Sequence, residues 1–440
     1  METTAKRSRR YRRYRRGFTL PVATAMLVVL LLVGFGFLRL GFTAQLKAIR
    51  TVEALSARAA ADSGLTKALF DMNNSLDVES EKLKNLPSSG SGALPNTSAN
   101  FAYEVDEVEK DSEYRIVSTG SCGRTHKVVS ATVMRQGYFD QAVFATGYAH
   151  PKHPKGIPDL HKPPKKGGKL EIDGYNVDGY SSNPQIASTG SSLLRTNSSH
   201  KESVRLKKNI VIDGDIVIGP GGKPDKVIKK DPGVVVTGSE YAAQERFTLL
   251  PVTVPQGLEN WAAQKYAYKA GKPISGTVKY TDLKIPKDKT QEIKGDCTIY
   301  VEHEFKIEEG AKLIIPEDCS LTLYVDGKID VKIDDKGEEE GLGMGGLINQ
   351  TKDPTKLTIF GTDTCSKIKV ETNENDFYGA IYAPYTKLEF KGSADIYGAL
   401  VGWDVKLQKK GSGQNPTFYY DEALLTEGTV RFVTVGWRDE

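Results

Sequence analysis

The sequence predicts a mainly β protein carried on one long N-terminal α-helix. Residues 18–38 contain no charged side chain, and a run of this length is sufficient for a membrane-spanning helix. After residue 142, short runs rich in Val, Ile, Leu and Tyr recur between Gly, Asp and Asn, which is typical of β-strands. Residues 376–393 also align without gaps on residues 395–412. We therefore expect a long helix, a small antiparallel sheet and a right-handed parallel β-helix, the hand being the usual one for parallel connections.

The N-terminus combines a basic leader, residues 1–17, with the apolar run at 18–38. The leader holds eight basic residues: Lys6, Arg7, Arg9, Arg10, Arg12, Arg13, Arg15 and Arg16. A helix over the apolar run would be roughly 31 Å long, which matches the hydrocarbon core of a bilayer. The positive-inside bias keeps the leader in the cytoplasm and places the rest of the chain on the exported side of a single-pass inner-membrane protein.

The leader also determines the sign of the net charge. With Glu2 it contributes +7 to a total of +4, so the remainder of the chain is near −3. The basic pI of the whole chain therefore reflects membrane topology, and we predict no nucleic-acid partner.

The junction Gly17-Phe18-Thr19-Leu20, followed by an apolar helix, resembles the type IV prepilin signal. The resemblance implies that a prepilin peptidase cuts after Gly17 and methylates Phe18, and that the helix then packs against other pilins or pseudopilins. The alternative is an uncleaved signal-anchor helix. Major pilins carry glutamate at the fifth mature position, where this chain has Val22. The sequence Leu-Pro-Val-Ala at residues 20–23 resembles that of the X/K-type minor pilins, which initiate or cap a fibre.

We expect the helix to continue to about residue 75, because no proline follows Pro21 until residue 87. Small residues are frequent in its second half, where 60–65 resembles a segment of X-type pilins. Residues 87–100 are rich in Ser, Gly and Pro and are expected to form a linker. Three alternating runs within 101–138 predict the small antiparallel sheet of a pilin-like head.

The parallel β-helix is expected over 142–425, followed by a C-terminal strand over 426–440. We expect each coil to stack on the next in sequence, with Gly379 above Gly398 and Gly392 above Gly411. A helical pattern at 257–270 interrupts the strands. This half also resembles an uncharacterised domain of long X-type pilin-like proteins, at 177–182, 379–384 and 421–424. The resemblance implies a β-helix without a known catalytic role.

Several groups of residues are candidate sites. Asp376 and Asp395 would lie on adjacent coils, where two close carboxylates could share a proton or hold a cation, or simply begin turns. The other candidates are metal ligands, although surface loops explain them better: His150, His153 and His161, the run 213–215, and the acidic loop 334–340. We predict no catalytic residues, no metal site and no cofactor.

Cys297 and Cys319 are a candidate disulfide, since they are separated by roughly one coil. Aligning residues 298–301 on residues 322–325 gives an offset of 24, however, which moves the two cysteines out of register. Buried free thiols are the alternative.

The sequence thus favours a minor pilin or pseudopilin-like protein that displays a β-helix at the cell surface or fibre tip, for assembly initiation or adhesion. It is not expected to be an enzyme. Its expected partners are the prepilin peptidase, other pilins, the inner membrane and, as a candidate, surface polysaccharide. The alternatives are a membrane-tethered enzyme that binds or degrades polysaccharide, and a static membrane anchor.

Overall fold

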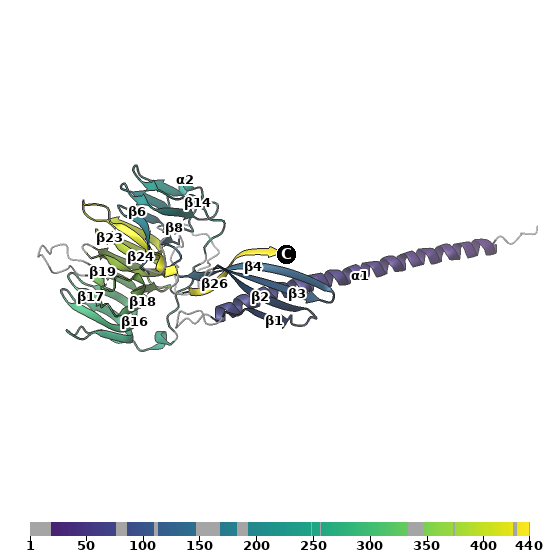
Figure 1. The fold of residues 1–440 in the computed structure, drawn as a ribbon, viewed down its shortest axis with the longest axis horizontal. Helices are drawn as coiled ribbons and strands as arrows, with labels where there is room; N and C mark the ends of the chain where they lie inside the picture. The colour runs from purple at the N-terminus through teal and green to yellow at the C-terminus, as the bar shows by residue number, and fades with distance from the viewer. Residues whose placement is uncertain are drawn as a thin grey trace, which may run out of the picture. The chain divides into compact units, whose positions relative to one another are not determined.

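The computed structural model describes residues 19–75, 86–109, 113–146, 168–182, 192–247, 249–255, 257–332, 346–372, 375–425 and 429–439. The chain divides into two compact units (Figure 1). The first unit comprises Met1–Ser75, Leu83–Met134 and Phe432–Glu440, and the second comprises Leu76–Lys82 and Arg135–Arg431. The second unit is therefore an insertion, because the chain returns to the first unit for its last strand.

The first unit contains the expected long helix, α1, from Thr19 to Asn74. At 1.5 Å per residue it is about 84 Å long. An antiparallel sheet packs against it, with strands in the order β1-β2-β3-β4-β26. Its strands are β1 (Ser89–Ala93), β2 (Asn100–Glu109), β3 (Glu113–Cys122), β4 (Thr125–Gly137) and β26 (Thr429–Asp439).

The prediction of a linker over 87–100 was wrong, because this segment contains β1. Its glycines allow the aromatic rings of β2 to cover the edge strand. A Cβ atom at Gly90 would lie 2.5 Å from the ring of Tyr103, and one at Gly92 would lie 2.5 Å from the ring of Phe101. The flexible composition therefore serves close packing in an edge strand. The sequence analysis also expected a C-terminal strand but gave it no partner, whereas β26 pairs with β4.

The second unit is a stack of parallel strands around one apolar core. Every pairing whose register is described in its 21-stranded sheet is parallel, as expected for coils of a β-helix; the right hand of the coils stays a prediction. The first half of the stack contains β5 (Val143–Ala145), β6 (Leu170–Asp173), β7 (Asn176–Tyr180), β8 (Ser192–Thr196), β9 (Val204–Lys207), β10 (Val211–Ile212), β11 (Gly214–Ile218), α2 (Pro224–Val227), β12 (Ile228–Lys230), β13 (Val235–Val236) and β14 (Glu240–Ala242).

The second half of the stack begins at residue 274. It contains β15 (Ile274–Ile285), β16 (Thr290–Ile307), β17 (Lys312–Ile315), β18 (Ser320–Val325), β19 (Lys328–Val331), β20 (Gly346–Asn349), β21 (Leu357–Gly361), β22 (Lys367–Thr372), β23 (Phe377–Gly392), β24 (Ile396–Lys409) and β25 (Thr417–Asp421). A 3-10 turn, η3 (Glu422–Leu425), follows β25.

The prediction that all coils stack in sequence order was wrong. The last coil of the second half pairs with the first coil of the first half: β24 pairs with β5 and β6, and β25 pairs with β7. We call these three pairings the seam. Figure 1 accordingly shows β14 and β16 toward opposite ends of the stack, with β24 between them. The chain thus enters and leaves the stack at its middle.

The core passes through the seam without interruption. Ile381, Leu400, Val143 and Leu194 follow one another in register and are each 0% exposed. Because neighbouring strands lie about 4.8 Å apart, these aliphatic side chains form one continuous column. The two halves therefore share a single hydrophobic core.

Residues 243–273, which we call the connector, link the ends of the two halves. Near its start, Phe247 exchanges two hydrogen bonds with the side chain of Asn197, beyond β8. Further along, Leu250 O accepts a hydrogen bond from Tyr382 in β23, and Gln264 pairs with the backbone of β15. The connector therefore runs along the stack. The helical pattern expected at 257–270 is absent apart from a 3-10 turn, η1 (Leu258–Asn260).

The connector explains an unusual row of outward-facing aromatic residues. Tyr300, Tyr324, Phe360 and Tyr382 follow one another in register, and Tyr382 is only 1% exposed. The hydroxyl of Tyr382 donates to Leu250 O at 2.7 Å. This side of the stack is thus apolar on both its inner and outer positions, because the connector shields the outer one from water.

The predicted offset of 19 residues between the two repeated segments is confirmed only over their first part. Gly379 lies opposite Gly398, as expected, and the offset of 19 holds to Ala383. A bulge then shortens the offset to 17, so that Gly392 lies opposite Lys409, and the expected stacking on Gly411 was wrong. Without the bulge the two repeated lysines, Lys387 and Lys406, would face each other. With it, Glu389 faces Lys406.

The seam predicts a specific disulfide. Cysteines replacing Glu171 and Lys406 should cross-link on mild oxidation, because these residues are register partners on adjacent strands and such Cα atoms lie within disulfide range. Peptide mass spectrometry would identify the linked fragments. The matched control joins Glu171→Cys to Glu389→Cys, two strands apart. Cross-linking of the control pair, or none between positions 171 and 406, would contradict the strand order.

Candidate functional site

The first candidate site is the N-terminal half of α1. From Val22 to Val52 every residue of the helix is exposed, although its first part, up to Leu38, contains no charged side chain. Leu30, Phe35 and Leu38 are each about 70% exposed. The helix is long and apolar enough to cross a membrane. Its surface can therefore be covered by lipid or by other apolar helices. The predicted cleavage residues, Gly17 and Phe18, lie outside the described residues.

The C-terminal half of α1 is covered by the sheet through small residues. Ala57, Ala60, Ala61 and Ala68 are 0% exposed. A Cβ atom at Gly120 of β3 would lie 2.0 Å from the carbonyl oxygen of Ala57. Glycine at position 120 thus lets the sheet approach the helix backbone. The alanine-rich sequence therefore divides the helix into an uncovered half and a sheet-bound half.

Polar contacts hold the end of α1 against the sheet. The hydroxyl of Tyr103 donates to Asp71 Oδ2 at 2.6 Å, and Lys67 forms an ion pair with Asp71. The hydrogen bonds from Lys67 and Tyr103 lower the pKa of Asp71. Burial and the hydrogen bond to Asp71 raise the pKa of Tyr103 to about 12. These contacts hold the helix against the sheet, and the Asp71 carboxylate and the Tyr103 hydroxyl are both used in them.

Asp376 and Asp395 lie on adjacent coils, as predicted. The backbone N–H of Asp395 donates to Asp376 Oδ1 at 3.1 Å, and the N–H of Thr417 donates to Asp395 Oδ1 at 2.7 Å. Each carboxylate therefore caps the next coil. Burial is the largest cause of a raised pKa at Asp376. This arrangement is that of turn residues, since each aspartate is engaged with backbone.

A stack of tyrosines lies beside these aspartates. The rings of Tyr378 and Tyr397 are 4.5 Å apart and nearly parallel, and those of Tyr397 and Tyr419 are 4.7 Å apart. Tyr180 packs edge-on against Tyr397 at 5.5 Å. Because the ring faces cover one another, they stabilise the stacking of coils and leave little ring surface for a ligand.

The remaining predicted sites are accounted for or lie outside the described residues. Asp213 accepts a hydrogen bond from Thr237, and Asp215 accepts one from the backbone of Ser239, so both brace the next coil. The three histidines at 150, 153 and 161 and the acidic loop 334–340 lie outside the described residues.

Cys297 and Cys319 are free thiols in the structure. Cys297 Sγ donates to Gly276 O at 3.1 Å, and Cys319 Sγ accepts from the N–H of Gly295 at 3.1 Å. The offset of 24 expected from the sequence is confirmed: Cys297 lies opposite Leu321. Because Cys319 falls two positions before Leu321, the two thiols are out of register. The structure therefore contains no disulfide between them.

The sequence analysis missed a row of charged residues along the outside of the stack. One outward position on nine successive strands, which we call the charged row, is occupied by Lys229, Arg205, Glu171, Lys406, Glu389, Lys369, Asp330, Lys306 and Lys284. From Arg205 to Lys306 the sign alternates at every strand. Opposite charges on adjacent strands stabilise the pairing, whereas like charges would oppose it. Aligning the lysine-rich strands would have revealed the alternation.

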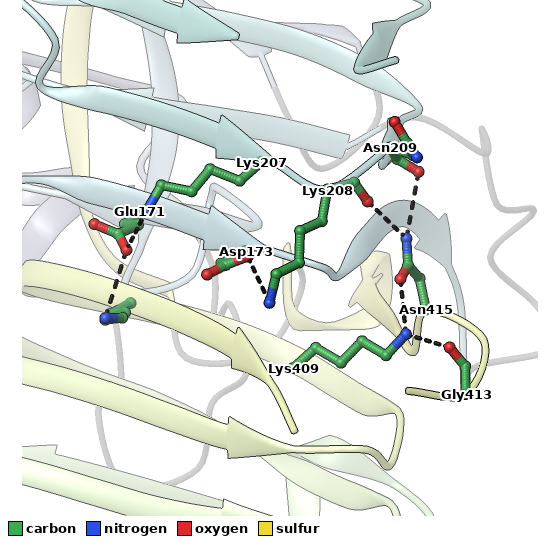
Figure 2. A network of polar contacts seen from close by, with 9 residues as sticks. Glu171, Asp173, Lys207, Lys208, Asn209, Lys409, Gly413 and Asn415 are labelled. Atoms are coloured by element: carbon green, nitrogen blue, oxygen red, sulfur yellow. Dashed lines mark hydrogen bonds and ion pairs between the residues drawn. The ribbon is translucent and has the colours of Figure 1, made fainter. Parts of the chain in front are cut away.

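The charged row crosses the seam between Lys406 and Glu171. Figure 2 shows the network of polar contacts around Glu171 and Asn415 at this place. Glu171 of the first half forms ion pairs with Lys207 at 2.9 Å and with Lys406 of the second half at 3.5 Å. Asn415 of the second half adds hydrogen bonds across the seam, since its Nδ2 donates to Lys208 O at 3.1 Å and to Asn209 O at 3.3 Å. The seam is thus held by core contacts, backbone pairing and polar contacts together.

Two further glutamates are each held between two lysines. Hydrogen bonds from Lys284 and Lys328 lower the pKa of Glu304 to about 2. Burial raises the pKa of Glu389, but hydrogen bonds from Lys367 and Lys387 outweigh it and lower the pKa to about 2. Both groups are therefore ionised over the physiological pH range.

A family model described as a domain of unknown function (DUF7305) matches residues 262–427. No curated protein sequence matches the chain. Among solved structures, the competence-associated pilin ComZ from Thermus thermophilus is similar, with 11% sequence identity and a TM-score of 0.26. The similarity covers 88% of this chain and 98% of that one.

The lysine-held glutamates predict acid-dependent stability. Their pKa in the folded state is below the ordinary value of 4.5, so the unfolded chain binds more protons and acid favours unfolding. The stability that these two glutamates contribute should be fully present above about pH 5.5 and be lost between about pH 4.5 and about pH 2. The double variant Glu304→Gln/Glu389→Gln should show a shallower fall of the urea midpoint, measured by circular dichroism.

The matched control for this experiment is Glu317→Gln. Glu317 is exposed, and no ion pair is described for it. The control should follow the unmodified chain across the whole pH range. Parallel curves for the double variant and the control would contradict a role for these two glutamates.

Proposed function

We propose that the chain is a minor pilin or pseudopilin-like protein. It is cleaved after Gly17 by a prepilin peptidase, N-methylated at Phe18 and anchored in the inner membrane by α1. The uncovered half of α1 packs against other pilins or pseudopilins. The coiled unit is displayed outward at the cell surface or fibre tip, where it serves assembly initiation or adhesion.

The division of α1 carries this proposal. One continuous helix is exposed over Val22–Val52, with no charged side chain up to Leu38, and its second half has alanines that are buried by an antiparallel sheet. A helix serving only its own domain would have its apolar surface covered. An exposed apolar surface of this extent needs a membrane or partner helices. The Gly17–Phe18 junction supplies the matching processing signal.

Val22 favours a minor rather than a major subunit. A carboxylate at this depth in an apolar helix requires a partner group, and in major pilins it helps to place the subunit in the filament. Val22 imposes no such requirement. A subunit without it suits a position at the start or tip of a fibre, where a large displayed unit also meets the least steric hindrance.

The insertion of the coiled unit supports display. The chain enters this unit in β4 and leaves it in β26, and these two strands are neighbours in the sheet of the first unit. The chain thus passes between the two units within two strands of one sheet. The proposal contains no catalytic step, because Asp376 and Asp395 are both engaged in capping the next coil.

The N-terminal mass of the protein from native membranes tests the proposal. We expect a chain that begins with N-methylated Phe18. The variant Gly17→Leu should remain in the membrane with residues 1–17 attached, because the apolar helix is unchanged while the cleavage site is lost. The matched control Gly41→Leu lies outside the predicted cleavage site and should be processed normally. An intact Met1 on the unmodified chain would contradict the proposal.

A further inference from the structure

One end of the stack carries a cluster of lysines and tyrosines. Residues 261–281, which we call the cap segment, contain four lysines, three tyrosines and a tryptophan but no Asp or Glu. Lys279 is buried and forms an ion pair with Glu302 at 2.9 Å. Lys265, Lys269 and Lys272 are exposed, and in the described part of the chain their ammonium groups have no ion-pair partner. They contrast with the paired lysines of the charged row.

The three lysines surround a hollow of about 340 Å³. Its lining also includes Tyr266, Tyr280 and Gln291. No acidic residue lines this hollow, so its electrostatic potential is positive. A hollow of this volume, with polar groups converging on it, is at the lower end of the size range of small-ligand sites.

The floor of the hollow is rigid. The hydroxyl of Tyr266 donates to Gln291 Oε1 at 2.8 Å, and Gln291 Nε2 donates to Lys272 O at 2.8 Å. Tyr266 and Tyr280 pack edge to face at 5.5 Å. Gln291 is 3% exposed and belongs to the next strand, β16. A hydrogen-bonded polar and aromatic floor is thus combined with three exposed cationic side chains.

We propose that this hollow binds one residue of an acidic polysaccharide, a uronate unit whose carboxylate is held by the lysines. The hydroxyls of a sugar suit the hydroxyl groups of Tyr266 and Tyr280, which line the hollow. Paired carboxylate and ammonium groups give specificity for an acidic over a neutral sugar. The inference names a ligand class for the proposed display role and rests on that role.

The surroundings of the hollow favour a polyuronate over a nucleic acid. Nucleic-acid binding depends on many phosphate contacts along a continuous positive track. Here Lys284, at the adjacent hollow, is already paired with Glu304 at 2.8 Å, and Asp282 lines that same hollow. Single-stranded nucleic acid also needs free ring faces, whereas Tyr266 and Tyr280 pack against each other.

The test is equilibrium binding of fluorescent polygalacturonate oligomers to the full chain in detergent micelles. The triple variant Lys265→Gln/Lys269→Gln/Lys272→Gln should weaken binding by at least about tenfold. Its control, Lys332→Gln/Lys356→Gln/Lys391→Gln, makes the same change in net charge at exposed positions elsewhere on the stack. Both variants keep the same N-terminus, so the comparison does not depend on whether the basic leader has been removed.

Loss of binding in the cap variant alone, with no binding of a neutral glucan of the same length, would support the proposal. Equal binding by the two triple variants would overturn it, as would absence of polyuronate binding or binding of oligo-dT without polyuronate. A chain that is processed to Phe18 but fails this test would reject the ligand and leave the display role intact. An unprocessed chain that passes this test would support the ligand and contradict the display role.

Discussion

The seam is the constraint on which the architecture of the coiled unit depends. Each half of the stack would otherwise present an open strand edge at its inner end, and exposed edges of this kind invite association with other chains. Pairing β24 with β5 and β6, and β25 with β7, closes both edges at once. The same pairing brings the entry and exit segments of the unit together, since Tyr420 donates to Phe139 O at 2.8 Å and Arg431 donates to Gln136 at 2.8 Å.

This arrangement reconciles a large insertion with a small sheet. An inserted domain can interrupt a sheet between two neighbouring strands only if its own ends lie close together. A stack built in sequence order would place its ends at opposite extremes. Starting at the middle, winding to one end and returning along the connector removes this conflict. The connector is therefore a topological requirement, and the outer aromatic residues, including Phe360 and Tyr382, bury it against the stack.

The sequence predicts much of the fold because local patterns determine local structure. The apolar run and the absence of proline predicted α1, and period-two alternation predicted β2 to β4. The repeat at 376–393 and 395–412 predicted parallel coils. The strand order was not predictable in this way, because a repeat reports similarity between coils and not which coils touch. The seam joins Val143 to Leu400, and no local pattern links residues so far apart.

The charged row was open to prediction, but only after alignment of the strands. Strands such as 367–372 and 387–392 place a charge on alternate positions, which reads simply as a solvent-facing side. Their signs gain meaning only in register, and the bulge after Ala383 shifts that register by two. The cap segment was missed for a different reason. Its lysines stood out only once the structure showed that three of them line one hollow that has no acidic residue in its lining.

Hydrogen–deuterium exchange of the full chain in detergent micelles tests the central role of the seam most directly. If the seam closes the stack, backbone amides of β5, β6, β24 and β25 should be among the slowest to exchange, because they lie in the middle of one continuous core. Amides of β14 and β15, at the ends of the stack, should exchange faster. Seam amides that exchange as fast as those of β14 and β15 would contradict this account, because the two halves would then be separate stacks.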